Sequence, residues 1–305
     1  MSAVPRQPFL MRLVVRLTLL AGALTCAATA SAASPAVAPL KGPVVCFYGP
    51  PPLEQLATYP TVVLQPALVT AADVAALHAR GCRVLGYVSL GEDDHLRRGN
   101  GKGAGGYAPW YVDEHAGPGF SRPGADGQPD SNPDWASYYV DPSDAGWRRV
   151  VKEQTDIIHR QLGMDGVFAD TVQIPRDVFT ARRERRMLKG MASLVGSLKA
   201  WSGGAVIVNN GGAELAVLGD KVDGIMIETR VEGAPGAWRD LQLELARLAP
   251  LRAGTFLVTA LVYLPAATAP HDACAALNAI DLPAALYRGD DAGRALTALP
   301  LATCP

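Results

Sequence analysis

Short apolar runs of strand length alternate with stretches of helical period from Val44 almost to the end of the chain. Each run holds four to eight residues rich in Val, Ile, Leu and Tyr, which is typical of strands buried on both faces. We therefore predict eight strands: Val44–Tyr48, Val62–Gln65, Val84–Leu90, Gly166–Asp170, Val206–Asn209, Gly224–Glu228, Phe256–Tyr263 and Ala284–Tyr287.

Helical stretches lie between these runs, at Ala71–Arg80, Ala145–Leu162, Val178–Trp201, Gly236–Leu248 and Asp272–Ile280. This alternation is the pattern of βαβ units, whose strands pair in parallel. We predict an α/β protein that forms a single (β/α)8 TIM-type barrel. A doubly wound open sheet is the alternative, but it usually has fewer strands and a nucleotide-binding turn.

A long insertion, from Asp93 to Ala136, follows the third predicted strand and ends in a short additional strand at Tyr138–Asp141. Its glycines at 101–106 match the G-x-G-x-x-G pattern, but no strand precedes them and no helix follows. We interpret them as part of a loop. His95 lies beside several acids in the same insertion, without a spacing that indicates a metal.

The first 32 residues have the features of a secretory signal peptide: three arginines, an apolar run from Leu17 to Ala30, and Ala30-Ser31-Ala32 as a cleavage signature. The run is shorter than the roughly 20 residues that span a bilayer, and no later segment replaces it. We expect residues 1–32 to be the signal peptide, 33–43 a Pro/Ala-rich linker, and 44–305 the barrel of a secreted or periplasmic protein without a stable membrane span. A lipoprotein site at Cys26 is the weaker alternative.

Composition and charge narrow the class of function. Hydrophobic residues make up 49% of the chain and charged residues 19%, so a sizeable core is available and global disorder is excluded. The 28 basic and 29 acidic residues give a formal charge of −1, which argues against nucleic acid as a partner. We expect no cofactor and no metal, and a monomer that acts on a polysaccharide.

Four cysteines follow the leader, an even number in a chain with an export signal, and they predict two disulfides. Four cysteines allow three pairings. We expect Cys46 to pair with Cys82, and Cys274 with Cys304, because each pair then closes a local part of the chain.

Acidic and amide side chains end several predicted strands: Glu92 follows the third, Asp170 ends the fourth, Asn209 the fifth and Glu228 the sixth. In a barrel these positions meet at the carboxyl ends of the strands, where active sites lie. Two carboxylates on nearby strands are what glycoside hydrolysis needs, and we predict Asp170 and Glu228 as that pair. The structural alternative is that either acid caps a helix or pairs with an arginine.

Aromatic residues accompany the acids. Flat amphipathic rings give sugars an apolar face on which to stack, although each ring alone is equally compatible with simple packing. The predicted substrate-binding residues are Tyr48, Tyr87, Glu92, Asp141, Asn209, Tyr263 and Tyr287, with Trp110 and Trp135 in the insertion. Motifs for serine hydrolases, zinc peptidases and P-loop enzymes are absent from the sequence.

The chain resembles the endo-α-1,4-polygalactosaminidase family of glycoside hydrolases and related exopolysaccharide hydrolases. The resemblance rests on Gly86-Tyr87-Val88-Ser89-Leu90-Gly91-Glu92, on Trp135 with Tyr139-Val140-Asp141, and on Gly163-Met164-Asp165-Gly166-Val167-Phe168-Ala169-Asp170-Thr171. It implies a secreted β/α barrel that cleaves a galactosamine-containing polymer. By resemblance, Asp170 and Glu228 are the two functional acids, and Glu92 and Asp141 line the cleft. The chain departs from the pattern at Gln173, where many relatives carry a further Asp.

We therefore expect a retaining glycosidase with Asp170 as nucleophile and Glu228 as general acid/base. A cationic amino-sugar polymer suits a site rich in carboxylates. Two alternatives remain: a polysaccharide-binding barrel that has lost catalysis and serves export or the matrix, and an enzyme that uses the same acids on another glycan.

Overall fold

The structure is a computed structural model that describes residues 40–93, 127–133, 135, 137–175, 179–231, 237–252, 254–290 and 295–305. In this part of the chain, nine strands form one sheet in the order β1-β2-β3-β7-β8-β9-β10-β11-β12. Their bounds are β1 Val44–Phe47, β2 Thr61–Leu64, β3 Arg83–Ser89, β7 Gly166–Asp170, β8 Ala205–Asn209, β9 Gly224–Arg230, β10 Leu257–Leu264, β11 Ala284–Arg288 and β12 Ala302–Cys304.

The first eight of these strands pair in parallel, and β12 pairs antiparallel with β11. The sheet curls until β1 contacts β10 and β11. Two long-range hydrogen bonds connect β1 to β10 and β11 at this closure. Tyr287 Oη donates to the Cys46 carbonyl at 2.8 Å, and Val44 N donates to Thr259 Oγ1 at 3.5 Å. The predicted TIM-type barrel with an insertion after its third strand is confirmed.

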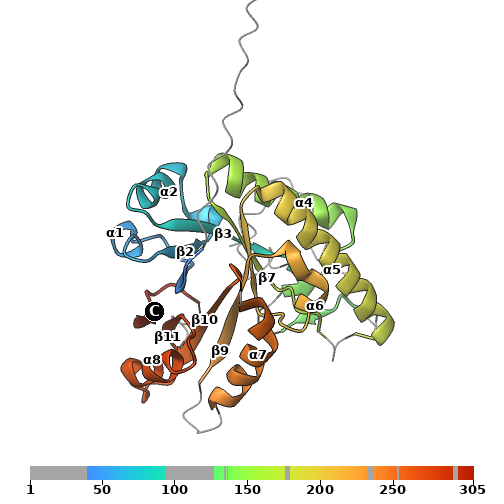
Figure 1. The fold of residues 1–305 in the computed structure, drawn as a ribbon. Coiled ribbons are helices and arrows are strands. Elements are labelled where there is room, and N and C mark those ends of the chain that lie inside the picture. The colour runs from blue at the N-terminus through green and yellow to red at the C-terminus, as the bar shows by residue number, and fades with distance from the viewer. Residues whose placement is uncertain are drawn as a thin grey trace, which may run out of the picture. The chain divides into compact units, whose positions relative to one another are not determined.

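Helices cover the outside of the curled sheet (Figure 1). Their bounds are α1 Leu53–Leu56, α2 Ala71–His78, α4 Ala145–Asp156, α5 Ala181–Ser202, α6 Leu215–Leu218, α7 Ala237–Arg252 and α8 Pro270–Asn278. Single turns of helix occur at Pro66–Leu68, Ile157–Gln161 and Gly219–Lys221. The predicted helix from Val178 begins instead at Ala181, because the Thr180 side chain accepts a hydrogen bond from Arg183 N and caps it.

The insertion between β3 and β7 contains a small antiparallel sheet in the order β4-β6-β5, with β4 at Glu92–Asp93, β5 at Ser131–Asn132 and β6 at Ser137–Tyr139. The predicted short strand near Tyr138 is thus confirmed. After it, the fully buried Trp147 of α4 donates from Nε1 to the Leu90 carbonyl at 2.9 Å. This bond ties α4 to the carboxyl end of β3.

Several predictions concern segments outside the described residues: the leader at 1–32, Cys26, His95, the glycines at 101–106, and Trp110. They stay predictions. Among the residues that the structure does describe, no helix is long and apolar enough to cross a bilayer.

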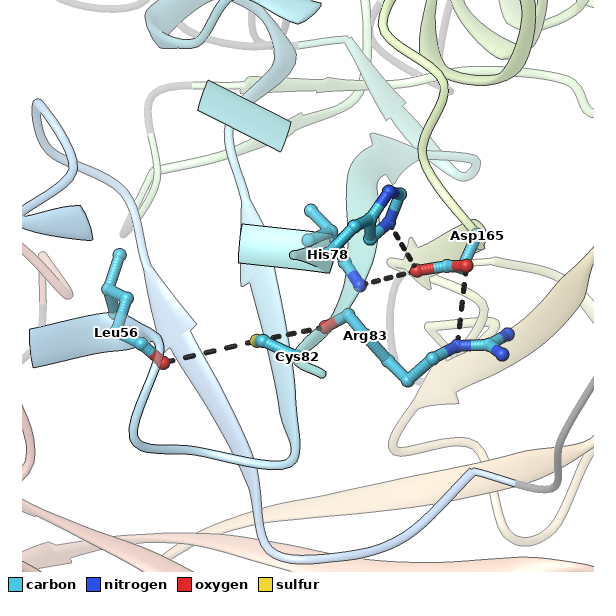
Figure 2. A network of polar contacts seen from close by, with 6 residues as sticks. Leu56, His78, Cys82, Arg83 and Asp165 are labelled. Atoms are coloured by element: carbon cyan, nitrogen blue, oxygen red, sulfur yellow. Dashed lines mark hydrogen bonds and ion pairs between the residues drawn. The ribbon is translucent and has the colours of Figure 1, made fainter. Parts of the chain in front are cut away.

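A polar network fastens the other end of the barrel, where β3 and β7 begin (Figure 2). Asp165, which directly precedes β7, accepts hydrogen bonds from Val84 N at 2.8 Å and His78 Nε2 at 2.9 Å. Its second oxygen lies 3.4 Å from Arg83 Nε. One carboxylate therefore joins α2, β3 and β7, far along the strand from the predicted site.

The cysteines form one of the two expected bridges. Cys274 of α8 and Cys304 of β12 are joined as predicted. The expected bridge between Cys46 and Cys82 is wrong, since both are free and buried. Cys46 lies on β1, whereas Cys82 lies at the start of β3, so β2 separates them. The Cys46 thiol lies 3.9 Å from the sulfur of Met226, and burial raises the pKa of Cys82 to about 12.

Candidate active site

Asp170 is the last residue of β7, and its carboxylate is held by three donors. Tyr87 Oη of β3 donates to Oδ2 at 2.8 Å, while Thr171 N and Asn209 Nδ2 donate to Oδ1 at 2.7 and 2.9 Å. The side chain is only half-buried, so it remains accessible to solvent. No arginine or lysine is among these three donors, and the carboxylate is oriented by neutral groups.

Asn209 bridges the two predicted acids. Its Nδ2 also donates to Glu228 Oε2, at 2.7 Å. Because one nitrogen contacts Asp170 Oδ1 at 2.9 Å and Glu228 Oε2 at 2.7 Å, these two oxygens lie no more than 5.6 Å apart. Two carboxylates from strands β7 and β9 thus meet above the carboxyl end of β8, as the sequence predicts.

Glu228 sits in a less polar setting than Asp170. Tyr263 Oη of β10 donates to Oε1 at 2.9 Å, and Glu228 N donates to Asn210 Oδ1 at 2.9 Å. Burial, followed by the charge of Asp170, raises the pKa of Glu228, while the hydrogen bonds from Asn209 and Tyr263 partly oppose that rise. A carboxyl group with a raised pKa next to a second carboxylate is suited to donate a proton.

The four predicted tyrosines separate into different roles. Tyr87 and Tyr263 each donate to one of the acids. Tyr48 follows β1 and packs edge-on against Tyr87 with ring centroids 5.2 Å apart, and burial raises its pKa. The hydroxyl of Tyr287 donates a hydrogen bond to the Cys46 carbonyl, so this tyrosine joins β11 to β1 and does not donate to either acid in the bonds described.

Glu92 and Asp141 lie in the insertion and make contacts within it. Glu92 accepts hydrogen bonds from Ser137 Oγ and from Asn132 Nδ2 at 3.3 Å. Asp141 is buried and accepts from Ser143 Oγ at 2.5 Å, and its other oxygen lies 3.3 Å from Arg186 of α5. The charge of Asp141 is therefore balanced locally by Arg186, and its place in the cleft stays a prediction.

Two residues directly after the strands contribute contacts that the sequence analysis did not assign. Thr171 and Asn210 both have positive φ, of 57° and 54°. Their polar atoms bind Asp170 Oδ1 and Glu228 N, respectively. The sequence does contain a signal that could have identified Thr171 and Asn210, because each of these polar residues directly follows a predicted site residue at the end of a strand. Gln173, the departure from the family pattern, is exposed just beyond them.

No cluster of three or more His, Cys, Asp or Glu side chains in the described segments is arranged to hold a metal ion. The chemistry available at this site is that of two carboxyl groups with tyrosine and amide donors around them.

The glycoside hydrolase family GH114 matches residues 54–269, which include both acids and all the strands from β2 to β10. This chain belongs to family GH114. Family GH114 consists of glycoside hydrolases, the enzyme class that the paired carboxylates indicate. No protein with a curated description matches the chain in sequence.

Solved structures share the barrel of this GH114 protein. The glycoside hydrolase domain of PelA from Pseudomonas aeruginosa is 23% identical, with a TM-score of 0.65 over 85% of this chain and 97% of that domain. Aspergillus fumigatus Ega3, solved in complex with galactosamine, is 14% identical, with a TM-score of 0.51 over 72% and 75% of the two chains. The α-galactosidase TtGalA from Thermus thermophilus is 13% identical, with a TM-score of 0.52 over 83% and 59%.

Proposed function

We propose that this GH114 protein is a secreted retaining glycosidase that cleaves a galactosamine-containing polysaccharide, with Asp170 as nucleophile and Glu228 as general acid/base. The observation that carries the proposal is the bridge by Asn209, which holds one oxygen of each acid within 5.6 Å of the other. Retaining glycosidases keep their two carboxyl groups about 5–5.5 Å apart, whereas inverting enzymes need about 6.5–9.5 Å to admit a water.

In the first step, an oxygen of the Asp170 carboxylate attacks the anomeric carbon as the bond to the leaving oxygen breaks. Glu228 gives its proton to that oxygen, so the leaving sugar departs as a neutral alcohol. Among the residues that the structure describes, Asp170 Oδ2 accepts from Tyr87 alone, whereas Oδ1 accepts from two donors. Oδ2 therefore keeps the more available lone pair, and we assign the attack to it.

In the second step, the ionised Glu228 takes a proton from water, whose oxygen attacks the anomeric carbon. The ester bond to Asp170 breaks, which regenerates both acids and retains the anomeric configuration. The raised pKa of Glu228 supports its role, because this group must carry a proton in the first step and lose it in the second.

The substrate follows from charge and from the relatives. Amino sugars with free amines are cationic, and Asp170 and the half-buried Glu92 supply negative charge at the end of β7 and just after β3. Ega3 was solved with galactosamine bound, which supports the same sugar here. The half-buried Tyr48, which packs against the Tyr87 ring beside Asp170, offers ring surface for a sugar face.

We assign the protein to the periplasm or the cell exterior, with residues 1–32 as signal peptide, 33–43 as linker and 44–305 as the barrel. The one disulfide, between Cys274 and Cys304, supports an oxidising compartment.

The test is hydrolysis of partially de-N-acetylated galactosamine polymer, with chitosan, a neutral galactan and an anionic polysaccharide as a comparison panel. We expect new reducing ends with the galactosamine polymer and none with the Asp170→Asn variant. NMR of the first product distinguishes retention from inversion. Binding of the polymer without cleavage would indicate a non-catalytic barrel, and cleavage of another polymer alone would replace the proposed substrate.

A further inference from the structure

We propose that Thr171 is a positioning residue for Asp170. The Thr171 hydroxyl joins the end of β3 to the end of β7 by hydrogen bonds, and this contact keeps Thr171 N hydrogen-bonded to the Asp170 carboxylate. This inference rests on the proposed function, in which Asp170 is the nucleophile. Thr171 itself does not reach the sugar; it acts through Asp170.

The backbone of Thr171 is in an unfavourable conformation. Its φ is 57°, and β-branched residues rarely adopt positive φ because Cβ crowds the following carbonyl. Such conformations persist only where the surroundings hold them, and they cluster at functional sites. The conformation has a visible result here, since it directs Thr171 N to Asp170 Oδ1 at 2.7 Å.

The hydroxyl of Thr171 supplies the restraint. Thr171 Oγ1 accepts hydrogen bonds from Gly91 N at 2.8 Å and Leu90 N at 3.1 Å, and it lies 2.9 Å from Ser89 Oγ. Ser89 Oγ in turn donates to the Glu92 carbonyl at 2.6 Å. One hydroxyl thus accepts from two main-chain donors at the turn that follows β3. Leu90 N also donates to the Asp170 carbonyl at 3.0 Å, and the Thr171 hydroxyl donates to that carbonyl at 2.7 Å.

Gly91 allows this close approach. A Cβ at Gly91 would lie 2.2 Å from the Thr171 carbonyl oxygen, so the two turns are in main-chain contact. On the opposite side of the same turn, Trp147 Nε1 donates to the Leu90 carbonyl. The turn after β3 is therefore fixed by α4 on one side, and Thr171 is fixed to the turn on the other.

Loss of the hydroxyl releases Thr171 from a conformation that it does not favour. Its N–H then leaves Asp170 Oδ1. Among the described residues, Asn209 remains as donor to Oδ1 and Tyr87 as donor to Oδ2, so two hydrogen bonds in place of three orient the carboxylate and its position becomes less exact. Misplacement of a reacting group by about 1 Å costs about 10²-fold in rate. We expect the loss in kcat, because the contact orients the nucleophile and does not bind the ground-state sugar.

The experiment compares Thr171→Val with Thr171→Ser and a matched control, Thr259→Val. Thr259 is fully buried, whereas Thr171 is half-buried, and Thr259 Oγ1 likewise joins separate segments, by donating to the Pro283 carbonyl at 3.0 Å and accepting from Val44 N. It lies near the start of β10, away from the acids. We expect both Val variants to melt at lower temperature. Only Thr171→Val should lose about 10²-fold in kcat with KM within about threefold, and Thr171→Ser should restore most of the rate.

A fourth variant keeps the test decisive if Thr171→Val fails to fold. Thr171→Gly removes the hydroxyl and accepts the positive φ of this turn, so it should fold. Because glycine adopts negative φ as readily, its N–H is no longer held on Asp170, and kcat should still fall. Wild-type kcat in Thr171→Gly or Thr171→Val would overturn the role of Thr171, as would equal losses of kcat in Thr171→Val and Thr259→Val. A wild-type protein that cleaves no polymer in the same assay would overturn the proposed function and this role with it.

Discussion

We predict that the hydroxyl of Tyr263 sets the pH range over which Glu228, the proposed general acid, is protonated. It donates to Glu228 Oε1 at 2.9 Å and stabilises the ionised form, which lowers the pKa of Glu228 against the opposing effect of burial. Replacing Tyr263 by Phe removes this donor and keeps the ring. Ionisation of Glu228 then becomes harder, so the acid stays protonated to higher pH.

The size of the effect follows from the bond. A hydrogen bond to a charged group contributes about 1.5–3 kcal/mol, and about 1.4 kcal/mol corresponds to one pH unit. The distance of 2.9 Å exceeds that of a short O–H to carboxylate bond, so the lower end applies. We expect the alkaline limb of kcat/KM in Tyr263→Phe to move upward by about 1 pH unit.

The assay measures kcat/KM of variant and wild type across pH on the same polymer, and the ratio at each pH removes the titration of the substrate amines. Tyr287→Phe is the control, because Tyr287 pairs with Tyr263 across β10 and β11 but donates to a carbonyl instead of an acid. Two results would refute the assignment of Glu228 as the acid. The alkaline limb of kcat/KM could be the same in Tyr263→Phe as in the wild type, or Tyr287→Phe could shift that limb as much as Tyr263→Phe does.

Three further predictions concern stability and its separation from activity. Asp165→Asn should lower the free energy of unfolding by about 2–3 kcal/mol and leave kcat within about threefold, because the contacts of Asp165 lie at the opposite end of β7 from the acids. Asp170→Asn should instead lose more than about 10³-fold in kcat and keep its stability. Urea unfolding and initial rates of both variants would contradict this if either variant lost both stability and activity. Burial raises the pKa of Glu228 above its unfolded value of 4.5, so its ionisation destabilises the fold as pH rises from there through the folded pKa. Glu228→Gln should therefore gain melting temperature relative to wild type as pH rises above 4.5, and a difference independent of pH would contradict this. Replacing Cys274 and Cys304 by Ser opens a loop of 30 residues and should lower the free energy of unfolding by about 3–4 kcal/mol. An unchanged midpoint of urea unfolding would contradict this prediction.

Much of the barrel is predictable from the sequence because parallel strands are buried on both faces and appear as unbroken apolar runs. The strand Gly166–Asp170 has the bounds that its apolar run predicts. Polar residues that directly end such runs must lie at the carboxyl edge, which is why Asp170, Asn209 and Glu228 could be placed together in advance.

The errors arise where three-dimensional neighbours decide. Closeness along the chain suggested a bridge between Cys46 and Cys82, but β2 lies between their strands. The placement of Asp141 in the cleft stays a prediction, but its contact with Arg186, from a helix 45 residues later in the sequence, has no signal in the local sequence. The positive φ of Thr171 has no signal in its residue type, since Thr rarely adopts it.

The five residues of β7 have an acid immediately before them and an acid as their last member, about 16 Å apart in extended chain. Asp165 fastens the scaffold, and Asp170 faces the substrate side. Because the residue that stabilises the fold and the proposed reactive residue lie at opposite ends of one strand, substitutions near either residue leave the surroundings of the other unchanged. Turns at the carboxyl edge of the barrel other than those of Gly91 and Thr171 can therefore accept substitutions for new sugars while the base of the barrel continues to fold unaltered.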